Sequence, residues 1–523
     1  MTGAGLHRPP PARSSARVAP HLTKTRYVAG VQCPKRLWLQ VYRRDLATPP
    51  DPGLRARLAA GDDVGIRARA LFPGGVAVDE KHYRHAQGVE KTRRMMAESR
   101  VPAIFEAFLE HAGVRVRVDV LERLGADAWG IREVKAATRL RDEHLADVAV
   151  QRMVADGMGI RVTSAELVHV NPAYVRGEGD VDPRGLFVRA DVTDATAALV
   201  APTRERVAAM HALLQAASPP GAAPSRHCFV PFPCEFWAHC TWEKPADWVF
   251  HLPRLPADAH AALAAAGIER IADVPDDVAL TPLQARVRAA VRAGAPVAEP
   301  SLAEALARLV PPLDYLDFET LVPVVPLYAG TRPYQPVPCQ WSLHRVDADG
   351  TLGHREFLAT LHGDPRPAFA ASLLAALGDG DRPIVVWGSF ESEVLAALAD
   401  ALPAQADRIH AARARLVDLY EVVRDHLYHP AFGGSFSLKR VAPALAPDFR
   451  WRTSAPVRME AGDDAAAALF RLASGRVRDD HEDVHLRRAL LDYCACDTRA
   501  TLEVHRAVRR LAGDETPLVR AHR

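Results

Sequence analysis

Two short stretches of the sequence combine acidic and phenolic side chains at spacings that suit metal-dependent chemistry. Asp317 and Glu319 are two residues apart in the run Asp-Tyr-Leu-Asp-Phe-Glu at 314–319. Side chains two apart on a strand point to the same face, so two carboxylates converge there. A divalent cation commonly relieves the repulsion between such carboxylates. Tyr493 and Asp497 are four apart, which places a phenol and a third carboxylate on one face of a helix.

A second acidic set lies nearer the start of the chain. Valines alternate with polar residues from Val114 to Val120, which predicts a half-buried strand that carries Asp119. After a glycine-marked turn, Glu133 and Lys135 share one face of a second strand. Two carboxylates and an ammonium group brought together across a hairpin suit metal-assisted hydrolysis of a phosphodiester. Only seven of the 66 basic residues are lysine, which adds weight to a lysine at this position.

The seven cysteines are few and odd in number for 523 residues, so a secreted disulfide framework is excluded. Cys33 stands alone before Pro34, whereas Cys228, Cys234 and Cys240 follow one another with five residues between successive members. Four thiolates suffice to hold one metal centre. The other three cysteines are expected to pack as small apolar groups.

The elements that would position the second-half residues follow in a clear order. A hairpin across Asp349-Gly350 is predicted after the first strand, because this dipeptide is a strong tight-turn signal. The continuous apolar run at 384–387 predicts a strand buried on both faces. The expected elements are strands at 313–319, 338–346, 351–358 and 384–387 and helices at 367–377, 390–402 and 486–511. This order predicts a mixed sheet with helices packed on it, within an α/β fold.

The length predicts two or three domains, and 48% hydrophobic with 25% charged residues indicates a folded chain. We expect a disordered tail at 1–20, a first domain at 21–245, a helical connector at 246–310 and a last domain at 311–515. The net charge of +2 excludes a polybasic mode of nucleic-acid binding. No apolar run reaches the roughly 18–20 residues of a membrane helix. The start lacks a secretory signal; an organellar transit peptide is the alternative to a frayed terminus, and a cytoplasmic location is expected.

The second-half motifs resemble the DEDDy branch of ribonuclease-H-like 3′–5′ exonucleases. Asp317, Glu319 and Asp497 would then bind two Mg²⁺ or Mn²⁺ ions, and Tyr493 would help to orient the attacking water. The family's middle carboxylate is an Asp after an aromatic residue, whereas here Glu391 follows Phe390. Glu391 is expected as the fourth ligand. Asp418 is the competitor, and a helix cap is the alternative role for Asp418.

The first-half residues resemble the PD-(D/E)xK nucleases of the RecB-like kind. Asp119, Glu133 and Lys135 would form the core motif, and Gln151 stands where that group has its characteristic glutamine. The histidine that many RecB-like enzymes place on an earlier helix is not evident, since Gly-Asp-Asp-Val-Gly occupies residues 61–65. Glu106 could supply the missing ligand, or it could be an ordinary surface glutamate.

The cysteine arrangement resembles RecB-like nucleases of the AddB and CRISPR-associated types. In those proteins one upstream and three downstream cysteines hold a [4Fe–4S] cluster that joins the two ends of the nuclease domain. The resemblance makes Cys33, Cys228, Cys234 and Cys240 the cluster ligands. The family's downstream spacing is C-x2-C-x5-C rather than the C-x5-C-x5-C found here. A structural Zn²⁺ and unliganded thiols are the alternatives.

Across nearly the whole chain the arrangement resembles an uncharacterised bacterial family known only as a domain of unknown function. The likeness includes the segments 332–335 and 434–439 and the Tyr493 motif. This resemblance supplies an architecture and no known substrate. The two carboxylate sets and the cysteine set together predict a metal-dependent nuclease acting on DNA in repair or in processing foreign DNA, with a 3′–5′ exonuclease half and a RecB-like half and with helicase or repair partners. The alternatives are a nucleic-acid-binding protein with inactive sites and an exonuclease directed at RNA. Residues 437–439 would face the nucleic acid, with Lys439 on a phosphate or simply solvated.

Overall fold

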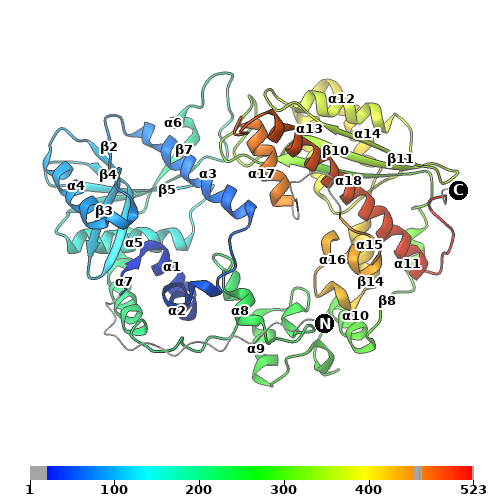
Figure 1. The fold of residues 1–523 in the computed structure, drawn as a ribbon, viewed down its shortest axis with the longest axis horizontal. Helices are drawn as coiled ribbons and strands as arrows, with labels where there is room; N and C mark the ends of the chain where they lie inside the picture. The colour runs from blue at the N-terminus through cyan, green and yellow to red at the C-terminus, as the bar shows by residue number, and fades with distance from the viewer. Residues whose placement is uncertain (1–19, 452–458, 460–461, 521–523) are drawn as a thin grey trace. The chain divides into compact units, whose positions relative to one another are not determined.

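The computed structural model describes residues 20–451, 459 and 462–520 (Figure 1). The tail predicted at 1–20 lies, except for Pro20, outside the described residues. The chain forms two compact units. The first contains the described residues up to Pro49 with Asp63–Val170 and Phe187–Cys240, and the second contains Pro50–Asp62, Asn171–Leu186 and the chain from Thr241 onward. In the described part of the chain, no helix is both long and apolar enough to cross a membrane.

A seven-stranded mixed sheet lies at the centre of the first unit. Strands β2 to β7 follow one another in sequence order across it, and β1 pairs with β4. Their bounds are β1 Leu22–Thr23, β2 Val76–Ala77, β3 Ala103–His111, β4 Val114–Arg123, β5 Trp129–Lys135, β6 Val162–Val170 and β7 Phe187–Asp191. Along β4 the predicted alternation is confirmed, because all four valines from Val114 to Val120 are buried and Arg117 is exposed.

The helix α5 (Asp142–Gly157) joins β5 to β6, which are parallel and therefore need a crossover. It packs against α7 (Thr193–Leu213) and α1 (Lys24–Gln32). The helix α2 (Pro34–Tyr42) follows at once, with Pro34 at its first position, where the missing N–H costs nothing. The remaining α-helices between residues 20 and 241 are α3 Pro52–Ala68, α4 His85–Ala97, α6 Pro183–Leu186 and α8 Trp237–Thr241.

A five-stranded sheet in the order β11-β10-β9-β12-β13 forms the centre of the second unit. Its strands are β9 Leu313–Leu321, β10 Val337–Val346, β11 Leu352–Leu358, β12 Ile384–Val386 and β13 Leu416–Asp418. The predicted hairpin is confirmed, since β10 and β11 pair antiparallel on either side of Gly350, whose φ is +80°. β12 runs parallel to both β9 and β13. Mixed strand directions and helices on the sheet confirm the α/β class.

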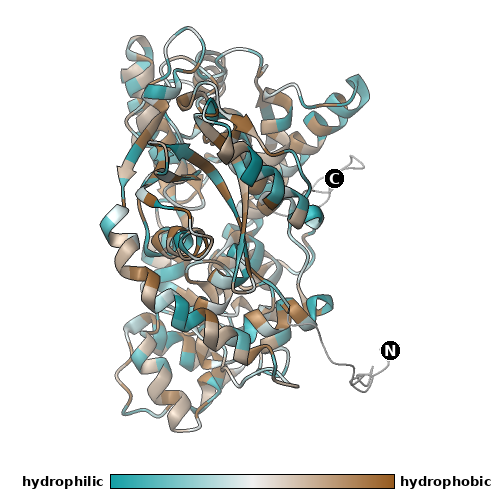
Figure 2. Cartoon of the chain, turned by 90° about the vertical axis from the view of Figure 1, so that its left-hand side faces the viewer, coloured by the Kyte–Doolittle hydropathy of each residue, from teal (hydrophilic) through white to brown (hydrophobic). Residues whose placement is uncertain are grey.

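The two faces of this sheet carry different side chains of β9. Leu316 and Phe318 pack in one hydrophobic core with α12 (Arg366–Leu377), α13 (Phe390–Ala401) and α14 (Ala406–Ala414). A separate core is formed by α17 (Gly462–Ala473), α18 (Asp480–Leu511) and side chains of β9 and β10. Figure 2 shows hydrophobic and hydrophilic residues sharing single helices, as these amphipathic roles require. Asp317 and Glu319 alternate with Leu316 and Phe318, so they belong to the α18 face.

The long helix α18 begins six residues before the predicted start at Leu486. Asp479 is its N-cap, and a side-chain oxygen of Asp479 accepts a hydrogen bond from the backbone N–H of Glu482 at 2.8 Å. Three acidic residues in the first turn interact favourably with the positive end of the helix dipole. The capping signal, rather than the apolar periodicity, therefore determines where the helix begins.

The residues predicted as a connector, 246–310, belong to the second compact unit. They contain α9 (Ala257–Ala265), α10 (Pro282–Ala293), β8 (Val297–Ala298) and α11 (Leu302–Leu306). β8 pairs with β14 (Leu427–Tyr428), which lies between α15 (Leu419–His426) and α16 (Leu438–Leu445). Arg286 on α10 also donates to the carbonyl oxygen of Arg424 at 2.9 Å. The segment is thus bound to the second unit by backbone pairing and side-chain contacts.

Candidate active sites

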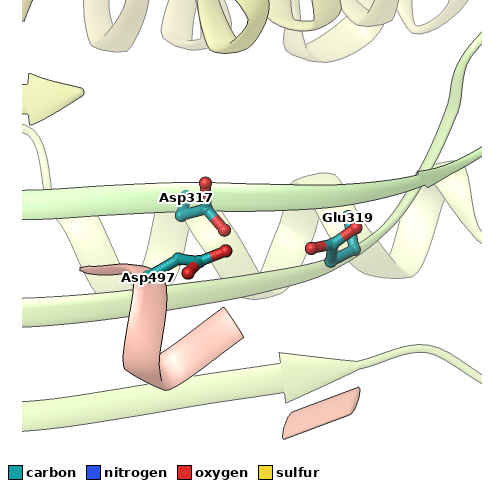
Figure 3. Close-up of side chains that lie close together, drawn as sticks. All are labelled: Asp317, Glu319 and Asp497. Carbon is teal, nitrogen blue, oxygen red and sulfur yellow. The ribbon is translucent and has the colours of Figure 1, made fainter. Parts of the chain in front are cut away.

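Three carboxylates converge on one face of the second-unit sheet. Asp317 and Glu319 come from β9 and Asp497 comes from α18 (Figure 3). One oxygen of each lies within 4.8 Å of the others, and no other group of three His, Cys, Asp or Glu side chains in the described residues meets this criterion. The close-up shows Asp317 and Asp497 pointing toward each other, with Glu319 alongside on the same strand. The predicted convergence of strand pair and helix carboxylate is therefore present.

Glu391 lies close to this cluster without belonging to the group of three. It is only 3% exposed on α13, and its Oε2 atom is buried with no hydrogen-bond partner among the described residues. Burial and the charge of Asp317 raise the pKa of Glu391 well above its ordinary value. A buried carboxylate oxygen without a donor is costly unless a cation or proton satisfies it.

Asp418, the competitor of Glu391, has a local role at the end of β13. Its Oδ1 accepts hydrogen bonds from the backbone N–H of Gly388 at 2.8 Å and of Tyr420 at 2.9 Å. Asp418 is the N-cap of α15. The helix-cap alternative is therefore what the structure shows for Asp418, and Glu391 remains the predicted fourth ligand.

The burial and mutual proximity of these carboxylates oppose their ionisation. Burial and the nearby charge of Asp497 raise the pKa of Asp317 to about 8. Burial, Asp317 and Asp497 together raise the pKa of Glu319 well above its ordinary value. Each group resists ionisation because its neighbours are also acidic. A divalent cation bound among these oxygens would remove that penalty, so the donor set fits Mg²⁺ or Mn²⁺.

Tyr493 and Lys439 complete the surroundings of Asp497. Tyr493 lies one turn before Asp497 on α18, is 3% exposed, and its phenol hydrogen-bonds the carboxylate. Burial and the nearby carboxylates raise the pKa of this phenol, which stays protonated. Lys439 forms an ion pair with Asp497 Oδ1, and its ammonium nitrogen lies 4.2 Å from the centre of the Tyr493 ring. Lys439 is therefore part of the cluster rather than a solvated lysine.

Two further neighbours of the cluster escape sequence reasoning. Trp451 donates its indole N–H to Asp497 Oδ1 at 2.5 Å. The Cys494 thiol donates to Asp317 Oδ2 at 3.2 Å. Cys494 is fully buried, as expected for a small apolar group, but it also contacts a candidate ligand. The Trp451 contact joins residues 46 positions apart, so no local pattern indicates it. Cys494 directly follows Tyr493, so its place in the motif is a signal that the sequence does offer.

The first-unit site brings together every residue that its motif predicts. Asp119 comes from β4, Glu133 and Lys135 from β5 and Gln151 from α5. Lys135 Nζ lies 2.7 Å from Glu133 Oε1, and Gln151 Nε2 donates to Glu133 Oε2 at 2.7 Å. Asp119 Oδ2 accepts the backbone N–H of Val134 at 2.8 Å. Asp147 on α5 joins the set through an ion pair with Lys135.

Lys24 is the member of this site that sequence reasoning missed. Its Nζ lies 2.7 Å from Glu133 Oε1 and 3.9 Å from Asp147 Oδ2. The scarcity of lysine is a sequence signal that points to Lys24, because three of the seven lysines lie in the two acidic sites. These are Lys24, Lys135 and Lys439.

Charge compensation in the first-unit site is uneven. Although burial opposes ionisation, Lys135 and Lys24 lower the pKa of Glu133 far below its ordinary value. Burial and the charge of Glu133 raise the pKa of Asp119 to about 7. Glu106, the alternative ligand, instead forms ion pairs with Arg69 at 3.1 Å and Arg117 at 2.8 Å. Glu106 is therefore held by arginines.

The four predicted cluster cysteines line a single pocket of the first unit. Cys33 joins α1 to α2, Cys228 and Cys234 lie in the loop before α8, and Cys240 lies on α8. Trp38, Leu39 and Phe236 form a hydrophobic group against which Cys234 and Cys240 pack. Burial raises the pKa of the Cys234 thiol to about 11. Metal binding there would displace thiol protons.

The spacing of these sulfur atoms bears on which metal centre they could hold. No three of the four come within 4.8 Å of one another. In a tetrahedral zinc site with Zn–S bonds of about 2.3 Å, neighbouring sulfurs lie about 3.8 Å apart. A [4Fe–4S] cluster places iron and inorganic sulfide between its thiolates and so needs a wider spacing. A zinc ion would therefore need some of these thiols to move closer together.

Comparison with known families gives one match. A family model described as "Domain of unknown function (DUF2779)" matches residues 314–437. The matched segment contains Asp317, Glu319 and Glu391 and ends before Lys439 and α18. The predicted resemblance to an uncharacterised domain family is confirmed for this segment. No curated protein matches the chain.

Proposed function

We propose that the second unit is a divalent-metal-dependent nuclease that removes nucleotides from the 3′ end of DNA. The observation that carries this proposal is the convergence of Asp317, Glu319 and Asp497 beside the unpartnered oxygen of Glu391. These acids would hold Mg²⁺ or Mn²⁺. Bound there, the cations would generate a hydroxide nucleophile from water and stabilise the leaving oxygen of the phosphodiester.

The protein groups around the acids have separate tasks in this proposal. The Tyr493 phenol stays protonated and hydrogen-bonded to Asp497, and its oxygen would accept a hydrogen bond from the attacking water and so orient it. Lys439 brings a positive charge next to Asp497, where a bound phosphate would need one. Backbone phosphates carry no base information, which fits a proposed enzyme of repair or foreign-DNA processing that acts on many sequences.

The decisive experiment is degradation of 5′-labelled DNA and RNA, single- and double-stranded, in Mn²⁺ or Mg²⁺. We expect a ladder of shortening products that begins at the 3′ end and disappears in Asp317→Asn. The matched control is Asp379→Asn, because Asp379 is an exposed carboxylate of the same unit that pairs only with Arg408 among the described contacts. Labelled strands that shift in a gel yet stay full length would replace the nuclease by a nucleic-acid-binding protein. A ladder on RNA alone would make RNA the substrate.

We also propose that Cys33, Cys228, Cys234 and Cys240 hold a [4Fe–4S] cluster in the first unit. Their shared pocket supports it, and no three of the four sulfurs lie within 4.8 Å of one another. Lys35 and Arg36 lie close enough to affect the electrostatics of these thiols and would offset the charge of four thiolates. Protein purified without oxygen should contain iron and acid-labile sulfide, both lost in Cys234→Ser. Stoichiometric zinc without sulfide would contradict the cluster.

A further inference from the structure

The two acidic sites differ in how the protein compensates their negative charge. In the second unit, three clustered carboxylates and Glu391 are matched by one ammonium group, that of Lys439 on Asp497. In the first unit, two ammonium groups from different elements meet on Glu133. The first site thus has two built-in ammonium groups on one carboxylate, whereas the second has one ammonium group for four acids.

Glu133 has little capacity left to bind a metal ion. Its Oε1 accepts from both Lys24 and Lys135, each at 2.7 Å, and its Oε2 accepts from Gln151 at 2.7 Å. The side chain is 1% exposed, so water does not compete for these contacts. Three of the about four acceptor positions of this carboxylate are thus used, and a divalent cation that approached the remaining one on Oε2 would meet the repulsion of two adjacent ammonium groups.

The other two acids of this site have fewer contacts, and they do not converge with Glu133. Asp147 pairs with Lys135 and lies 3.9 Å from Lys24, and Asp119 accepts the backbone N–H of Val134. Together with Glu133 they do not bring one oxygen each within 4.8 Å, in contrast to the second-unit acids. The three acids therefore do not converge in the way a hard cation requires.

We infer that the Lys24 ammonium group takes the place of a divalent cation in the first-unit site. This site then binds no Mg²⁺ or Mn²⁺ and performs no metal-dependent hydrolysis. The inference concerns metal uptake and is independent of the nuclease proposed for the second unit. It replaces the expectation that Asp119 and Glu133 are metal ligands.

Mn²⁺ binding to the full chain tests the inference without measuring activity. Mn²⁺ prefers oxygen ligands over thiolates, and its free six-line paramagnetic resonance signal disappears on binding. The background variant is Asp317→Asn with Glu319→Gln, which disables the second-unit site. We expect this background to bind no Mn²⁺. We expect that adding Lys24→Met to the background creates a site for a single Mn²⁺ ion. Glu133→Gln added to that triple variant should abolish the restored binding.

A matched control separates the ammonium position from general loss of positive charge. Lys91 lies in the same unit with a similarly exposed side chain and pairs with Asp79 at 3.8 Å. Lys91→Met in the same background should leave Mn²⁺ unbound. A folded Lys24→Met variant that gains no ion would overturn the role given to Lys24.

The inference stays testable if Lys24→Met fails to fold. The background variant and the background with Glu133→Gln both retain Lys24, and neither should bind Mn²⁺. Mn²⁺ bound by the background and lost with Glu133→Gln would show a functioning metal site and overturn the inference. The melting temperature of each variant establishes that it is folded.

Discussion

At the scale of single residues, the buried acids of the second-unit site lower the stability of the folded chain at neutral pH. Asp317 has a pKa of about 8 in the folded chain against 3.8 for an ordinary Asp, because it is buried beside Asp497. A group whose pKa rises on folding binds its proton more tightly in the folded state. Its contribution to stability is therefore present below pH 3.8 and is lost as the pH rises toward 8.

Asp317→Asn should accordingly stabilise the metal-free protein at pH 8. Asparagine keeps the shape and removes the charge, so we expect a gain on the order of 2 kcal/mol in the free energy of unfolding. At pH 4 the gain should nearly vanish. Urea unfolding in EDTA at the two pH values measures this difference. Equal stability of both proteins at pH 8 would show that the carboxylate is compensated in the metal-free state.

Lys439 should have the opposite effect, because it neutralises the buried Asp497 carboxylate. Lys439→Met leaves that carboxylate without its ammonium partner, which we expect to cost about 1–3 kcal/mol in EDTA. Saturating Mg²⁺ should recover part of the loss, since a cation replaces the missing charge. Lys244→Met is the control, because Lys244 pairs with the exposed Glu269 and should contribute under about 1 kcal/mol. Thermal melts with and without Mg²⁺ distinguish the cases.

Sequence reasoning finds residues of the sites where local periodicity is sufficient. Asp317 and Glu319 are brought to one face by strand alternation, and Tyr493 and Asp497 by the helix repeat. Lys24 and Trp451 are missed because they come from elements that only the tertiary fold brings to the acids. Their contacts span 109 and 46 residues of sequence. A cation that compensates a carboxylate at such a distance leaves no spacing pattern.

At the scale of elements, the predicted strands and helices of the second unit are confirmed, and their ends differ for local reasons. The strand predicted at 313–319 continues to Leu321 because β10 pairs with it as far as that residue. The excursions Pro50–Asp62 and Asn171–Leu186 into the second unit are set by tertiary contacts, such as Arg176 donating to the carbonyl oxygen of Pro326 at 2.8 Å. Composition and periodicity contain no signal for such contacts.

The contact between α18 and β9 predicts a dependence of stability on pH. His505 on α18 is fully buried and hydrogen-bonds the Tyr315 hydroxyl of β9 at 2.7 Å. Burial and the nearby Arg509 lower the pKa of His505 to about 3, from 6.5 for an ordinary histidine. The unfolded chain therefore gains a proton as the pH falls from about 6.5 toward 3, whereas the folded chain does not. Stability is lost over that range, by at most about 1.4 kcal/mol per pH unit for one histidine.

His505→Gln should reduce this slope, because glutamine keeps a hydrogen-bonding group and does not titrate. We expect the variant to be less stable than the wild type at pH 7.5 and to lose less stability on acidification to pH 5. His344 also has a pKa lowered to about 3, chiefly by burial. The part of the pH dependence of stability that His344 causes should therefore remain in the variant. Unfolding in urea at several pH values measures both slopes. Identical slopes in the variant and the wild type would contradict the buried neutral state of His505.

At the scale of the whole molecule, the chain forms two compact units, and we expect each to have its own unfolding transition. The proposed cluster connects Cys33 with Cys228, Cys234 and Cys240, all in the first unit. Closing a loop of nearly 200 residues lowers the entropy of the unfolded chain, which is worth about 5 kcal/mol by the loop-closure relation. Cys33→Ser should therefore lower the first-unit transition and leave the second-unit transition unchanged. Differential scanning calorimetry under nitrogen measures both transitions.

The control for this prediction is Cys496→Ser, in the second unit, which should leave the first-unit transition in place. If Cys33→Ser left both transitions unchanged, the four cysteines would contribute no connection between the ends of the first unit.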